Sequence, residues 1–289
     1  MRKIILLFLT FNLLLTGYGQ NMRSIEDSLV TLLNHVRAAS NDKDVNERNS
    51  QFSEYLKEIL SKRGKEAFNH SFDSLGKLMC TLKSPDNEFR IFNWNIEKPT
   101  SEKHSFFCFI LKYDNKKEDA TIVELQNRSQ MYNRPEQEAT DEKKWYGALY
   151  YKIIPVKSGE KTVYTLLGWD GNNRLTNKKL IETMTFSGKK VKFGHPIFTD
   201  ENGNMKKRVV FEYSEEAFMS LKYYPDKKNP RIIFDHLSPE TEQMRDHFQF
   251  YKPDLSYDAY VWDGAKWRYE KDIDARNSGK SKLPYNNPE

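Results

Sequence analysis

The hydrophobic periodicity of this sequence changes once, about a quarter of the way along the chain. Before the change, apolar residues recur every three or four positions, as in amphipathic helices. Ile25 and Leu29 belong to one such stripe, and Phe52 and Leu56 belong to a second stripe beyond a polar stretch. After the change, short alternating runs of Val, Ile, Phe and Tyr are separated by polar turns, which is typical of consecutive β-hairpins.

We therefore expect an α+β fold, with a helical N-terminal region over 20–75 and an antiparallel β-rich domain over 76–271. Helices that come first in the chain form a hairpin, and consecutive strands form a large, mainly antiparallel β-sheet. This sheet is expected as a sandwich or as a strongly twisted, partly closed sheet. The chain lacks the regular strand–helix alternation of Rossmann and TIM-barrel folds. It also lacks the repeat of about 40–45 residues that marks a WD-type propeller.

The first residues predict export from the cytoplasm. Arg2 and Lys3 precede a short apolar run, and Gly17 and Gly19 lie just before a predicted cleavage site. This layout is that of a secretory signal peptide over residues 1–19. Because the apolar run is shorter than the roughly 18–20 residues of a membrane helix, we expect no stable membrane span after cleavage. The predicted location is periplasmic or secreted.

Charge and motif content exclude several classes of function. The chain has 46 Lys and Arg against 41 Asp and Glu, and the two signs are interspersed rather than clustered. This distribution argues against a nucleic acid partner. The sequence has no P-loop, GxGxxG or GxSxG motif and no Cys/His cluster, so we expect no cofactor and no metal. Residues 272–289 are poor in apolar side chains and are expected to be disordered.

The chain has two cysteines, Cys80 and Cys108, and each shares its predicted strand face with apolar residues. Export favours disulfides, because the compartments outside the cytoplasm are oxidising. Buried free thiols fit the apolar surroundings equally well. The sequence leaves both alternatives open.

Two Trp-Asp-Gly stretches are candidate ligand-binding segments. "YTLLGWDGNN" contains Trp169 and Asp170, and "VWDGAKWRY" contains Trp262. Asp-Gly and Asn favour tight turns by their own chemistry, so both stretches are predicted primarily as hairpin turns. The functional alternative makes Trp169 and Trp262 stacking platforms and Asp170 a carboxylate at the rim of a cleft.

Three residues are candidate catalytic groups. Asp235 and His236 end an apolar run, and His195 lies between a glycine and a proline. Aspartate and histidine side chains can act as acids and bases. Ser238 and Pro239 follow in the pattern of a helix N-terminus, which predicts a brief helix after this strand. Hydrogen bonding within the loops is the non-catalytic alternative for all three candidates.

Residues 145–270 resemble an uncharacterised family of secreted proteins from Gram-negative bacteria. The segments that carry the resemblance are "WYGALYYKIIPV", "YTLLGWDGNN", "FGHPIF", "KRVVFEYS", "FMSLKYY", "IIFDHLSP" and "PDLSYDAYVWDGAKW". No activity is known for this family. The resemblance therefore implies an exported, β-rich protein and no catalytic residue.

The function that we expect from the sequence is that of an exported binding or envelope-associated module without enzymatic activity. Its partner would be a glycan or an envelope protein. The alternative is a periplasmic hydrolase that acts on glycan or peptide through Asp235, His236 and His195. An enzyme should gather these side chains around one concave pocket.

Overall fold

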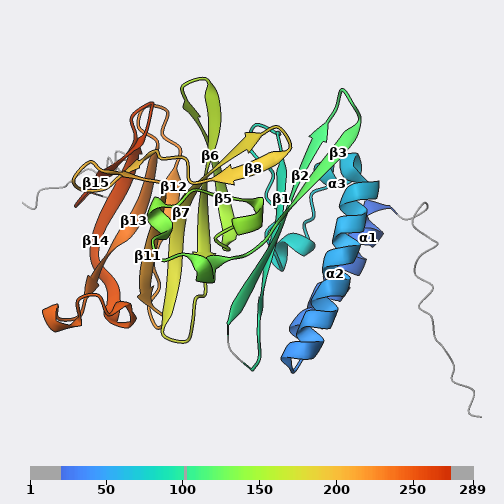
Figure 1. The fold of residues 1–289 in the computed structure, drawn as a ribbon, viewed down its shortest axis with the longest axis horizontal. Coiled ribbons are helices and arrows are strands. Elements are labelled where there is room, and N and C mark those ends of the chain that lie inside the picture. Colours follow the sequence, from blue (N-terminus) through green and yellow to red (C-terminus); the bar gives the residue numbers. More distant parts are fainter. Residues whose placement is uncertain (1–20, 101–102, 275–289) are drawn as a thin grey trace, which may run out of the picture.

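A computed structural model describes residues 21–100 and 103–274 (Figure 1). The predicted signal peptide therefore lies outside the described residues, as does the predicted tail beyond residue 274. The predicted α+β fold is confirmed: a pair of packed N-terminal helices is followed by three mainly antiparallel β-sheets. In the part of the chain described here, no helix is both long and apolar enough to cross a membrane.

The N-terminal helices pack as the periodicity predicts. Asparagine side chains cap the first two: Asn21 accepts a hydrogen bond from the backbone of Ser24, and Asn41 accepts one from Asp44, both at 3.0 Å. Such caps satisfy backbone N–H groups that lack a partner in the first turn. The helices are α1 (Met22–Arg37), α2 (Asp42–Lys62) and α3 (Gly64–Asn69), followed by a short 3-10 turn, Leu75–Lys77.

The strands form three sheets, where the sequence predicted a large, mainly antiparallel sheet as a sandwich or as a strongly twisted, partly closed sheet. The first sheet contains β1 (Arg90–Glu97), β2 (His104–Asp114) and β3 (Asp119–Leu125) in that order. The central sheet has the order β4 (Thr140–Asp141), β8 (Lys190–Phe193), β7 (Thr176–Ser187), β6 (Lys161–Asp170) and β5 (Leu149–Ser158), and β11 (Arg208–Ser214) also pairs with β7. The third has the order β10 (Met205–Lys206), β9 (Phe198–Thr199), β15 (Trp267–Glu270), β14 (Tyr251–Trp262), β13 (Arg231–Pro239) and β12 (Leu221–Tyr224).

These elements lie in four layers, with the helices on the outside of the first sheet and the central sheet between the other two (Figure 1). Three separate hydrophobic cores fill the spaces between the layers. Consecutive residues of the central sheet face different cores: Leu166 packs toward the first sheet, and Leu167 packs toward the third. Burial on both faces explains why these strands read as continuous apolar runs rather than strict alternation.

Both cysteines are free thiols. Cys80 and Cys108 pair with Asn93 from its two opposite sides, so they are two strands apart in the same sheet. Two strand spacings amount to about 10 Å. A disulfide requires Cα atoms within roughly 7 Å of each other, so this geometry excludes the bridge that the sequence left open.

The predicted brief helix at Ser238 and Pro239 is wrong. Both residues belong to β13, where they lie opposite Lys252 and Tyr251 of β14. Two short 3-10 turns, Glu242–Met244 and Phe248–Phe250, follow instead. Pairing with a strand more distant in the sequence overrides the local preference for a helix start, because propensity is weak beside tertiary contacts.

Candidate functional site

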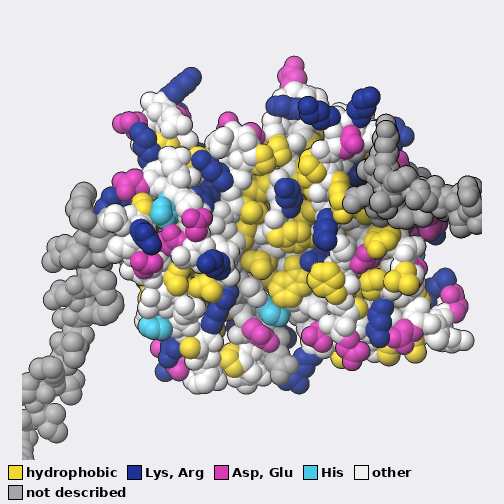
Figure 2. Space-filling model, turned by 180° about the vertical axis from the view of Figure 1, so that it is seen from behind, with side chains coloured by type: hydrophobic (Ala, Val, Ile, Leu, Met, Phe, Trp, Pro, Cys, Tyr) yellow, Lys and Arg dark blue, Asp and Glu magenta, His cyan; other side chains and the backbone are white. Residues whose placement is uncertain are grey.

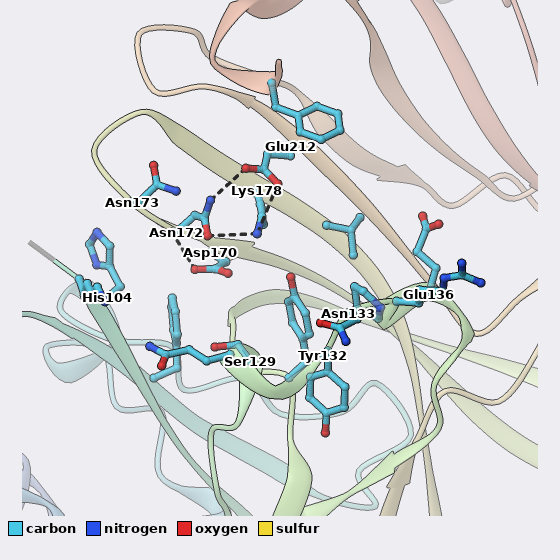
Figure 3. A pocket seen from close by; sticks show the side chains of 18 of the residues that line it. His104, Ser129, Tyr132, Asn133, Glu136, Asp170, Asn172, Asn173, Lys178 and Glu212 are labelled. Carbon is cyan, nitrogen blue, oxygen red and sulfur yellow. Dashed lines mark hydrogen bonds and ion pairs between the residues drawn. The ribbon is translucent and has the colours of Figure 1, made fainter. Parts of the chain in front are cut away.

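A cavity of about 840 Å³ lies at the end of the central sheet where β6 finishes and β7 begins (Figure 3). Segment 129–137, which contains the 3-10 turns Ser129–Met131 and Pro135–Gln137, forms one wall. His104, the first residue of β2, also lines the cavity. The site is therefore built by the first sheet, the central sheet and the connection between them.

Three charged side chains lie in a row across the central sheet. Asp170 of β6 lies directly opposite Lys178 of β7, which in turn lies opposite Glu212 of β11. Residues directly opposite one another share one face of a sheet, and all three line the cavity. The Lys178 ammonium is 3.4 Å from the Glu212 carboxylate. The row thus places one ammonium between two carboxylates, which alone would repel each other.

Asn172 connects the members of this row (Figure 3). Its backbone N–H donates to Asp170 at 2.8 Å, and its amide nitrogen donates to Glu212 at 3.1 Å and to Thr176 at 2.6 Å. Its amide oxygen accepts from Lys178 at 3.0 Å. Asn172 has φ of 39°, a left-handed conformation that asparagine tolerates better than most residues. The turn is therefore held by the same polar network that lines the cavity.

Gly171 allows His104 to approach this turn. A Cβ atom at position 171 would lie 2.3 Å from Cδ2 of His104, closer than real Cβ atoms come. The His104 ring is held in place by Asn95, whose amide nitrogen is 3.1 Å from Nδ1, and by an edge contact with Trp169 at 5.3 Å between ring centroids. An amide nitrogen can only donate, so this contact requires Nδ1 of His104 to accept.

The wall formed by segment 129–137 is fastened to the central and third sheets. The carbonyl oxygen of Pro135 accepts a hydrogen bond from Arg208 at 2.5 Å, and the Glu136 carboxylate is 3.2 Å from the Lys206 ammonium. Arg208 is itself fully buried and forms an ion pair with Glu182 at 2.8 Å. A charge pair in the core thereby positions the cavity wall.

Asp170 is the most deeply buried carboxylate of the cavity, with 5% of its surface exposed. Burial raises the pKa of Asp170, and the N–H of Asn172 and the charge of Lys178 offset only part of that rise. Burial also raises the pKa of Tyr146, which lines the same cavity, and the charge of Asp170 adds to the effect. Burial thus favours the protonated form of the Asp170 carboxyl.

The cavity offers donors and acceptors rather than a metal site. Within residues 21–100 and 103–274, no group of three or more His, Cys, Asp or Glu side chains could hold a metal ion. The network of Asp170, Asn172, Lys178 and Glu212 presents carboxylate, amide and ammonium groups to a ligand. Such groups recognise hydroxyl and amide groups by hydrogen bonding.

Of the predicted ligand-binding residues, Asp170 lines this cavity, whereas Trp169 and Trp262 do not. Trp169 is half-buried and lines a different groove. Trp262 packs against Trp267 at 5.2 Å between ring centroids, across the β14–β15 hairpin. The Trp-Asp-Gly stretches do end strands, but only the first contributes to the cavity.

The predicted catalytic residues Asp235 and His236 have local structural partners in the third sheet. The Asp235 carboxylate accepts the backbone N–H of Ser220 at 2.7 Å, which fixes the segment before β12. His236 Nδ1 is 2.8 Å from the carboxylate of Asp258, which also accepts the Tyr269 hydroxyl at 2.6 Å. Neither Asp235 nor His236 lines the large cavity.

His195 lies between β8 and β9, and its carbonyl oxygen accepts a hydrogen bond from the Thr183 hydroxyl at 3.0 Å. Burial and the charge of Lys161 lower the pKa of His195. It does not line the cavity either. The large cavity therefore does not bring together the three residues proposed for catalysis, and their catalytic role stays a prediction.

The sequence patterns did not predict Lys178, Glu212, Asn172 or His104 as site residues. Lys178 and Glu212 belong to no sequence motif. Only the pairing of β6, β7 and β11 places them beside Asp170. One signal was available: residues 126–139 form a long connection between β3 and β4. Long connections inside a compact domain are commonly functional.

No known protein family, curated protein or solved structure matches this chain. The resemblance to secreted proteins of Gram-negative bacteria therefore stays a prediction from the sequence segments alone.

Proposed function

We propose that this chain is an exported binding protein whose large cavity takes a neutral, hydroxyl-rich ligand such as a glycan. The observation that carries the proposal is the row of Asp170, Lys178 and Glu212, joined by Asn172, along the cavity. A sugar hydroxyl both donates and accepts, so it can bridge adjacent carboxylate and ammonium groups.

The charge balance of the lining supports a neutral ligand. Three acidic and three basic side chains line the cavity, so their formal charges cancel; they are Glu136, Asp170, Glu212, Lys103, Arg134 and Lys178. Aromatic side chains are also present, including Tyr132 and Tyr146. Their rings offer apolar surface beside the polar groups, as many ligand sites do.

Export is proposed from the sequence, on the predicted signal peptide over residues 1–19. A glycan of the bacterial envelope is a ligand that such a protein would meet. The resemblance to secreted proteins of Gram-negative bacteria points to the same compartment.

The test is calorimetric titration of the purified protein with neutral oligosaccharides. Asp170→Asn replaces an acceptor oxygen by a donor, and Gln130→Trp fills the cavity from an exposed lining position. Asp170→Asn is expected to weaken binding by about tenfold or more, since a hydrogen bond to a charged group is worth about 1.5–3 kcal/mol. Gln130→Trp is expected to weaken binding as well, because the larger side chain occupies the space of the ligand. Glu160→Gln, an exposed carboxylate in the β5–β6 turn, is the control. Equal affinities in all three variants would refute the site.

A glycan hydrolase is the second candidate, and one observation favours it. The buried Asp170 carboxyl, whose pKa is raised, faces the same cavity as Glu212 two strands away. A pair of carboxyl groups, one of them with a raised pKa, is the usual equipment of glycoside hydrolysis. Incubation with oligosaccharides followed by mass spectrometry tests it: cleavage that Asp170→Asn abolishes supports a hydrolase, and intact substrate contradicts it.

A further inference from the structure

A second cavity, of about 500 Å³, lies where residues 76–82 pass the start of β5 and the end of β6. We call it the Trp169 groove. Most of its side-chain lining is apolar: Leu78, Met79, Leu82, Leu149, Tyr151 and Trp169. Lys77 is the one charged residue among those that line it, and no carboxylate does. Its chemistry is therefore the opposite of the polar cavity.

Trp169 and Asp170 are neighbours in the sequence but line different cavities. They are consecutive residues of β6, and successive side chains of a strand point to opposite faces. Asp170 consequently lines the polar cavity, whereas Trp169 lines the groove. In the row of Trp169, Leu149 of β5 lies on one side and Lys179 of β7 lies on the other.

Lys179 is a half-buried cation beside the groove. Its ammonium is 4.7 Å from the ring centroid of Tyr151, which lines the groove with 38% of its surface exposed. Burial lowers the pKa of Lys179, and no carboxylate of the described residues forms an ion pair with it. Its neighbour Lys178, in contrast, pairs with Glu212. A partly buried charge without a counter-ion is unfavourable, so an anion placed here gains free energy.

We propose that the Trp169 groove binds a free fatty acid, whose acyl chain lies along the apolar walls and whose carboxylate pairs with Lys179 and Lys77. We propose a fatty acid rather than a neutral lipid because a neutral lipid would leave the ammonium of Lys179 without an ion pair. The volume of the groove lies in the range of roughly 300–1,000 Å³ that is usual for ligand sites.

One face of the molecule combines apolar and basic groups (Figure 2). On the face turned away from the viewer in Figure 1, apolar side chains gather over the middle of the molecule with single basic side chains among them (Figure 2). Acidic side chains on this face lie mainly toward its margins (Figure 2). Such a surface favours an anionic, apolar ligand over a cationic one.

The test uses oleate to displace a fluorescent fatty acid from the full-length mature protein. We expect displacement in the wild type, about tenfold weaker binding in Lys179→Gln, and near wild-type binding in Lys179→Arg, because one charge-assisted contact is worth about a factor of ten. Lys190→Gln, an exposed lysine of β8, is the matched control and is expected to bind as the wild type does.

Three results would overturn the proposal: no displacement by oleate, equal binding of oleyl alcohol, or equal affinities of Lys179→Gln and Lys190→Gln. Lys179→Gln breaks no ion pair with a described residue, so it should remain folded, and a urea denaturation curve checks this. Asp170→Asn should leave oleate binding unchanged, since Asp170 lines the other cavity. Glycan binding and fatty acid binding can thus fail independently.

Discussion

At the scale of single residues, the turn after β6 depends on the absence of a side chain at position 171. The space that a Cβ would occupy is taken by the ring of His104, which is held by Asn95. Close packing of this kind leaves no room for one added methyl group. The contact also joins β2 to the turn that carries Asp170 and Asn172, so one glycine couples the first sheet to the polar cavity.

Gly171→Ala is expected to lower the free energy of unfolding by about 1–3 kcal/mol, the usual cost of overpacking. The added Cβ would collide with His104 Cδ2. His104→Ala in the same chain should restore part of the loss, because it removes the colliding ring. Urea denaturation of the two single variants and the double variant measures the coupling. Strictly additive losses would show that the collision is not the cause.

The pKa of Asp170 makes a second prediction at this scale. Burial raises the pKa of the folded-state carboxyl above its unfolded value, so the folded protein ionises Asp170 less readily than the unfolded chain does. The protein therefore loses stability at this site between acidic and neutral pH. Asp170→Asn cannot ionise at this position and so does not lose this stability. The free energy of unfolding of the variant, relative to that of the wild type, should therefore increase from about pH 3.5 to pH 7. Urea titrations at both pH values check it, with Glu160→Gln as control; an unchanged difference contradicts the prediction.

At the scale of elements, a buried charge pair joins β7 to β11 and fixes the loop between β3 and β4. Glu182 and Arg208 lie opposite each other with no exposed side-chain surface. Glu182 also accepts a hydrogen bond from the Tyr150 hydroxyl, which in turn accepts one from Trp145 at 2.7 Å. Burial by itself lowers the pKa of Arg208, but Glu182 more than offsets this, so the guanidinium stays charged.

Glu182→Leu should destabilise the fold by about 3–5 kcal/mol, because Arg208 is left as a buried cation without its partner. The double variant Glu182→Leu with Arg208→Met should be more stable than that single variant, since both charges are gone. Urea denaturation compares them. A double variant that is less stable than Glu182→Leu would mean that the pair is not the main source of the loss.

Asp235→Ala tests whether the strand end of β13 has a structural role. The change leaves the N–H of Ser220 without its acceptor, which should cost about 1–3 kcal/mol. Oligosaccharide and oleate binding should both be unchanged, because Asp235 lines neither cavity. Denaturation and calorimetry on the same preparation separate the two effects. Lost binding in a fully folded variant would restore Asp235 as a candidate site residue.

At the scale of the whole molecule, four layers enclose three hydrophobic cores. Cys108 lies in the core between the first and central sheets with 2% of its surface exposed. Burial raises the pKa of Cys80 to about 12 and raises that of Cys108 well above its usual range. Both thiols are therefore protonated at neutral pH, and a protonated thiol is a poor nucleophile.

Thiol labelling with Ellman's reagent measures how accessible the two cysteines are in this layered fold. The native protein should react very slowly at neutral pH, and two thiols should react at once in denaturant. Because the slow step for Cys108 is the opening of the layers, its labelling rate should rise in step with destabilising variants such as Glu182→Leu. Rapid labelling of Cys108 in the native protein would contradict its burial.

Periodicity predicted the fold class correctly because it reports which faces of an element are buried. The helical stripes around Leu29 and Leu56 and the alternation beyond them sufficed for helices first and antiparallel strands afterwards. Periodicity did not predict three sheets, because Leu166 and Leu167 are apolar whichever layer each one faces. Local patterns also misplaced a helix at Ser238, where pairing with β14 prevails.

For the site, the sequence drew attention to Asp170 through the turn chemistry of Asp-Gly-Asn-Asn, and the structure places that carboxylate in the polar cavity. Turn residues act locally, so the sequence alone determines that β6 ends where it does. Only the tertiary structure brings Lys178 and Glu212 beside Asp170 and turns Trp169 toward a second, apolar groove. The register between distant strands is set by the burial of both faces of the central sheet, which no local pattern contains.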